Sequence, residues 1–95
     1  LREILKQLSV ELTYRADTNY INALNYYAYL HWSSSPDSVL LLSEQGLNLS
    51  EKINFHAGKL KALINIGTGH FAKGDYVKAL IIENEAVTLA KELNN

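Results

Sequence analysis

The chain has no cysteine and no methionine among its 95 residues, and its only proline is Pro36. Without cysteine it can form no disulfide and perform no thiol chemistry, which fits either a cytosolic or an extracytoplasmic location. One proline and five glycines are few interruptions for a chain of this length. Long helices can therefore run between them.

Long apolar runs and an excess of one charge are also absent. The longest apolar run, residues 26–30, is far shorter than the roughly 20 residues of a membrane-spanning helix. The formal net charge of -1 argues against general affinity of this segment for nucleic acid or anionic membranes. No signal-peptide pattern opens the chain. Because it starts at Leu1 and lacks methionine, we expect it to be a fragment of a longer protein.

Apolar residues recur at helical spacing along the whole chain. They make up 47% of the sequence, which is ample for a small globular core. Steps of three and four residues, as from Leu5 to Leu8 and Leu12, are typical of amphipathic helices. Strict alternation, the sign of a strand, is not sustained. The pattern predicts an all-α fold of about five helices, at residues 2–14, 18–32, 36–53, 56–72 and 75–92.

The predicted breaks carry residues suited to helix ends. Ser35 can cap a helix that has Pro36 in its first position. Gly74 suits the left-handed residue after a helix, and Asp75 can cap the next one. Two further breaks are predicted, at residues 17–19 and at Asn54.

Two parts of the sequence repeat one another at a distance of forty residues. Residues 49–54 (LSEKIN) are echoed by residues 89–94 (LAKELN), and Asn25 and Asn65 occupy the same place in their repeats. A period in this range indicates stacked supersecondary units. Such units share a core with their neighbours and offer an extended surface, which favours binding over catalysis. We divide the single domain, residues 1–95, into an orphan helix (1–17), a first repeat (18–54) and a second repeat (55–95).

The second repeat resembles a tetratricopeptide repeat. The resemblance rests on Asn65-Ile66-Gly67, Gly74-Asp75-Tyr76, Ala79-Leu80 and Ala86. The period of forty is similar to elongated variants in sensory regions of bacterial histidine kinases, nucleotide cyclases and transcriptional regulators. The resemblance implies antiparallel helix pairs stacked into an α-solenoid. It also implies a protein- or peptide-interaction module of a bacterial signalling protein, with no cofactor and no catalytic turnover.

The first repeat departs from the pattern at one helix crossing. Tyr27 stands where the second repeat has Gly67, and Gly46 stands where it has Ala86. We interpret this as an exchange of a large and a small residue that preserves volume.

The resemblance also implies where a partner would bind. Asparagine at the place of Asn25 and Asn65 faces the concave groove in peptide-binding relatives and can hydrogen-bond a ligand backbone. The other residues implied on this surface are Leu24, Ala28, Ile64, Thr68 and Phe71, with Lys61 at its edge. The predicted binding residues are Asn25, His31, Trp32, Lys61, Asn65 and Thr68.

The aromatic block around Tyr26, Tyr27 and Tyr29 has two interpretations. We expect chiefly that these rings fill space between helices, and alternatively that some line the groove. His31, His56 and His70, the three histidines, lack metal-ligand spacing, so no metal site is predicted.

Three alternatives to peptide binding remain open. The chain could self-associate as a homodimer, either through apolar helix faces or through its acidic segment (16–51) and basic segment (52–78). It could instead be a spacer with no ligand of its own. Less expected is a helical enzyme fragment that uses His31 or His70 with a nearby carboxylate.

Overall fold

The computed structural model describes residues 2–94, which form four α-helices and no strand. The all-α class is confirmed, but the described residues contain four helices where about five were predicted. Residues 1 and 95, the outer ends of the predicted segments, lie outside the described residues. The helices are α1 (Arg2–Leu30), α2 (Pro36–Lys52), α3 (His56–Ala72) and α4 (Tyr76–Leu93).

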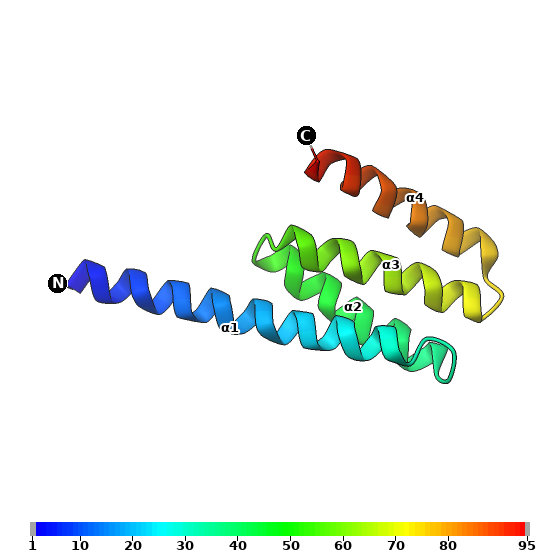
Figure 1. The fold of residues 1–95 in the computed structure, drawn as a ribbon, viewed down its shortest axis with the longest axis horizontal. Coiled ribbons are helices and arrows are strands. Elements are labelled where there is room, and N and C mark those ends of the chain that lie inside the picture. Colours follow the sequence, from blue (N-terminus) through cyan, green and yellow to red (C-terminus); the bar gives the residue numbers. More distant parts are fainter. Residues whose placement is uncertain (1, 95) are drawn as a thin grey trace.

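Consecutive helices run back and forth in an elongated arrangement of 56 × 31 × 16 Å (Figure 1). Each helix packs on the next one, and α1 also contacts α3. Among the described residues α4 packs on α3 alone. The N-terminal part of α1 projects beyond the other helices (Figure 1). No helix within residues 2–94 has both the length and the hydropathy to cross a membrane.

The predicted break at residues 17–19 is wrong, because α1 runs through it without interruption. None of these three residues is glycine or proline, so nothing forces the backbone out of the helix. The hydroxyl of Thr18 donates to the carbonyl of Arg15 at 3.0 Å, a bond that forms inside a helical turn. Polar residues that often end helices are therefore accommodated in the middle of this one.

The remaining breaks lie where they were predicted. Gly74 has φ 84° and Asn54 has φ 57°, so both are left-handed residues between helices. Ser35 precedes α2 and Asp75 precedes α4, but neither side chain makes a capping hydrogen bond. The turn backbone, more than side-chain capping, thus sets these helix starts.

The core is small and consists mainly of short side chains. Ile21 and Val39 are its largest fully buried apolar residues. Alanines and glycines at the helix crossings let the backbones approach closely, which brings buried polar side chains within reach of neighbouring helices. The buried apolar residues are Ile21, Ala28, Val39, Ala62, Leu63, Ile66, Ala79 and Ala86; the buried polar residues are Asn25, Ser43, Ser50 and Asn65.

The acidic segment (16–51) and the basic segment (52–78) form ion pairs with each other within one chain. Glu51 and Lys59 form an ion pair at 3.6 Å, next to the turn between α2 and α3. At the other end of these helices, Lys73 donates to Asp37 at 2.6 Å, and this hydrogen bond raises the pKa of Lys73. The contribution of this ion pair to the stability of the fold is complete at neutral pH, and it is lost as the pH rises through the raised pKa of Lys73.

Candidate functional site

A pocket of about 260 Å³ opens between α1 and α3. Residues three and four apart share one face of a helix, so the α1 residues of the lining follow one another along a single face. The α3 residues of the lining are spaced in the same way. The pocket therefore lies in the seam between α1 and α3. Its lining consists of Asn22, Asn25, Tyr26 and Tyr29 from α1 and Lys61, Ile64 and Asn65 from α3.

The floor of the pocket is a pair of buried amides. Asn25 is 2% exposed and Asn65 is 6% exposed. Nδ2 of Asn25 donates to the carbonyl of Gly58 at 3.1 Å, and Nδ2 of Asn65 donates to the carbonyl of Asn25 at 2.9 Å. These bonds tie α1 to α3 across 33 and 40 residues of sequence. The asparagines thus tie α1 to α3, each through one of the two N–H groups of its Nδ2 atom.

Gly46 provides the space that the Asn25 side chain occupies. A Cβ atom on Gly46 would lie 2.7 Å from Oδ1 of Asn25, which is too close. The predicted exchange of volume between Gly46 and Tyr27 is therefore wrong. Tyr27 is 54% exposed, and its ring lies 4.4 Å from that of His31. The small residue on α2 accommodates an amide of α1, not a tyrosine.

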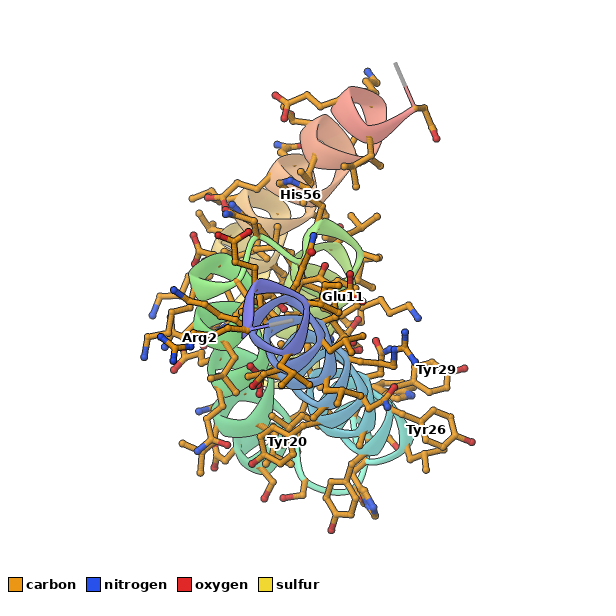
Figure 2. The ribbon with its side chains drawn as sticks, turned by 90° about the vertical axis from the view of Figure 1, so that its left-hand side faces the viewer. Arg2, Glu11, Tyr20, Tyr26, Tyr29 and His56 are labelled. Atoms are coloured by element: carbon orange, nitrogen blue, oxygen red, sulfur yellow. The ribbon has the colours of Figure 1, made fainter. Side chains whose placement is uncertain are left out.

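The outer wall of the pocket is aromatic. Tyr26 and Tyr29 are both exposed, and they project from the same side of α1, whereas Tyr20 points elsewhere (Figure 2). The prediction that this aromatic block fills space between helices is wrong for these tyrosines. Their rings are instead available to a partner. Asn22 was not among the predicted binding residues, although its position three residues before Asn25 places it on the same face of α1.

Lys61 gives the mouth of the pocket its charge. It is exposed, it is the only charged residue of the lining, and within residues 2–94 it forms no ion pair. Ile64 lies one turn further along α3 and is 50% exposed. The pocket therefore combines an apolar wall with a positive charge and has no acidic residue in its lining.

The other predicted binding residues lie outside this pocket. His31 and Trp32 lie in the turn after α1, where Trp32 is exposed. The hydroxyl of Thr68 donates to the carbonyl of Ile64 at 3.0 Å, within α3 itself. The pocket thus brings together Asn25, Lys61 and Asn65 from the predicted set, and leaves His31, Trp32 and Thr68 apart.

Residues that the resemblance placed on the same surface are also divided. Ile64 lines the pocket, but Ala28 is fully buried in the core. Leu24 is half-buried, and Phe71 packs against Tyr76 with ring centroids 5.3 Å apart. The exposed seam between α1 and α3 is therefore narrower than the resemblance implied.

His70 is the one histidine beside a carboxylate in the described part of the chain. Its Nδ1 lies 3.8 Å from Oδ2 of Asp75, at the turn between α3 and α4. This pair is outside the lining of the α1–α3 pocket. Within residues 2–94, no group of three histidine, aspartate or glutamate side chains is placed to hold a metal ion.

No family model matches the chain, and comparisons with curated proteins and with solved structures find no significant match. The candidate site is a pocket with a buried amide floor, an aromatic wall and one lysine, set in the seam between α1 and α3.

Proposed function

We propose that this chain is a protein- or peptide-interaction module of the tetratricopeptide type, and that a partner segment docks in the α1–α3 pocket. The observation that carries the proposal is the pocket itself, with exposed tyrosines along a seam between equivalent helices. Tyrosine is enriched among the residues that anchor protein interfaces. Concave seams between packed helices are common binding sites.

The arrangement of the helices supports a stack of repeats. Each helix packs on the next, and the first helices of the two repeats, α1 and α3, also contact each other. Leu40 of α2 packs against Gly69 of α3, where an added Cβ would lie only 2.8 Å from it. This is the nearest-neighbour packing expected of a solenoid. In a bacterial sensory region, docking in the seam would bias the packing of these helices and so the state of an attached domain.

Blocking the pocket should strongly weaken peptide binding. Peptides selected from a random display library on the wild-type chain would be tested on Ile64→Arg, which places a long charged side chain in the pocket. We expect at least a tenfold loss of affinity, because a central apolar contact is replaced by a charge. The measurement is fluorescence polarisation with the labelled peptides.

Ile81→Arg is the matched control, because Ile81 is 55% exposed on α4 and lies outside the pocket. It should bind the peptides as the wild type does, and both variants should keep the wild-type circular dichroism. Selected peptides that bind Ile64→Arg and wild type equally would place the binding surface elsewhere and contradict the proposal.

Self-association is a second candidate function, favoured by the uncovered apolar face of α4. Leu80 is exposed, whereas Leu40, its equivalent in the first repeat, is half-buried under α3. A second copy that covers this face would make the mass of the protein depend on its concentration. Sedimentation over a concentration series should then show a dimer that Leu80→Glu with Val87→Glu returns to a monomer. A constant monomer mass would remove this candidate and leave peptide docking.

A further inference from the structure

We infer that the α1–α3 pocket selects one large apolar side chain, best an aromatic one, from a partner segment in which a carboxylate lies next to it. The apolar side chain enters between Tyr26 and Ile64, and the carboxylate pairs with Lys61 at the mouth. The inference rests on the proposed docking function and specifies the chemistry of the partner.

The size of the pocket fits a single side chain. Its volume is about 260 Å³. An apolar cavity of about 150 Å³ already admits a benzene ring, whereas pockets for drug-sized ligands begin at roughly 300 Å³. One aromatic side chain with its stem therefore fills the space, and a bulky cofactor exceeds it.

The floor of the pocket disfavours a polar occupant. The Nδ2 atoms of Asn25 and Asn65 donate to backbone carbonyls of the chain itself. An amide or carboxylate that entered fully would lose its water, and one of the two N–H groups of each Nδ2 atom already bonds a backbone carbonyl, so the floor offers few donors in exchange. Hydrogen bonding of a ligand backbone by the engaged N–H groups, as the resemblance implied, would break the tie between α1 and α3. The floor therefore favours an apolar group.

The walls favour an aromatic group in particular. Tyr26 and Tyr29 project from the same side of α1 (Figure 2), and Ile64 faces the pocket from α3. Aromatic rings in contact gain stabilisation beyond the area they bury, through offset or edge-to-face packing. Because these tyrosines are exposed in the free chain, an incoming ring would not have to displace a core residue.

The charge of Lys61 indicates that the apolar side chain of the partner should have an acidic neighbour. Lys59 and Lys73, the lysines that face α2, are paired with Glu51 and Asp37. Lys61 has no such pair within residues 2–94, and no acidic residue lines the pocket. An unpaired cation beside an apolar pocket is complementary to a carboxylate that follows an apolar group.

The minimal probes are 3-phenylpropionate, 3-phenylpropanol and butyrate, added to the ¹⁵N-labelled chain and followed by amide chemical shifts. We expect 3-phenylpropionate to shift the amides around Lys61 and Ile64, with a dissociation constant on the order of millimolar. The neutral alcohol should bind at the same place about two- to fivefold more weakly. Butyrate, which has the charge without the ring, should cause no saturable shift there. Equal binding of butyrate, or shifts confined to another surface, would overturn the inference.

Lys61→Gln and Lys78→Gln separate the role of the pocket from that of overall charge. Lys78 is exposed on α4 and outside the pocket, so its replacement changes the net charge equally. Lys61→Gln should reduce the affinity for 3-phenylpropionate to that for the alcohol, while Lys78→Gln should leave it unchanged. Equal effects of the two variants would overturn the role of Lys61.

The selected peptides distinguish this inference from the docking function on which it rests. Peptides that bind through the pocket but lack an apolar residue beside an acidic one would overturn the inference and leave the docking function standing. Failure to obtain any pocket-bound peptide would overturn the docking function, whichever small probe binds.

Discussion

Replacing Asn25 with alanine is expected to lower the free energy of unfolding by about 2–4 kcal/mol. The substitution removes the hydrogen bond to the carbonyl of Gly58 and leaves a cavity where a 98% buried side chain had been packed against Gly46. Urea denaturation followed by circular dichroism measures the change.

Asn22→Ala is the matched control for this substitution. Asn22 lies one turn earlier on the same helix and lines the same pocket, but it is exposed. Its loss should change the free energy of unfolding by no more than about 0.5 kcal/mol. If the two variants were equally stable, the buried amide would not be a tie between α1 and α3.

Variants of Asn25 and Asn65 are unsuitable for testing the pocket. Substituting Asn25 or Asn65 would weaken the fold and the binding surface together, so a loss of binding could not be assigned to either. Ile64 and Lys61 are exposed and make no tertiary hydrogen bond in the described part of the chain, so they can be replaced without that ambiguity.

The second large effect is expected for Gly58→Ala, which should destabilise the chain by about 1–3 kcal/mol. An added Cβ would lie 2.5 Å from the ring of Phe55 and 2.6 Å from Oγ of the fully buried Ser50. Alanine is a better helix former than glycine by about 1 kcal/mol, so the steric cost must exceed that gain. The thermal or urea midpoint of the variant measures which effect is larger.

Gly67→Ala provides the comparison, because it makes the same change in the same helix. Its Cβ would lie 3.1 Å from Cγ of Glu83, an exposed side chain that can move aside. We expect this variant to be neutral or stabilised by up to about 1 kcal/mol. A destabilisation equal to that of Gly58→Ala would show that glycine is needed in α3 for a reason other than the contact with Phe55 and Ser50.

The sequence was sufficient to predict the helical class and most helix boundaries. Pro36, Asn54 and Gly74 mark the three turns because their preferences act locally, within a few residues. Residues 17–19 misled the prediction because polar side chains favour a helix end without requiring one. The helix continues through these residues, and α1 packs on α2 and α3.

The candidate site could be predicted only in part. The matching positions of Asn25 and Asn65 were visible in the repeat, and both residues do belong to the pocket. The burial of Asn25 was not visible, because it depends on Gly46 of α2 and Gly58 of α3, which come into contact with Asn25 only in the folded chain. For the same reason, the periodicity could not decide whether Tyr26 filled the core or faced solvent.

The hydrogen bond from Asn65 to the carbonyl of Asn25 has a geometric consequence for longer arrays. Donor and acceptor are both asparagines and lie forty residues apart, which is the period of the sequence repeat. In further copies of this repeat, the asparagine at this position could therefore donate the same hydrogen bond to the backbone carbonyl of the asparagine in the preceding copy. This series of hydrogen bonds would restrict the rise and rotation from one repeat to the next, because a hydrogen bond tolerates far less variation in length than a contact between flexible side chains. In such an array one amide per repeat would constrain how the next repeat is placed, together with the packing of neighbouring helices.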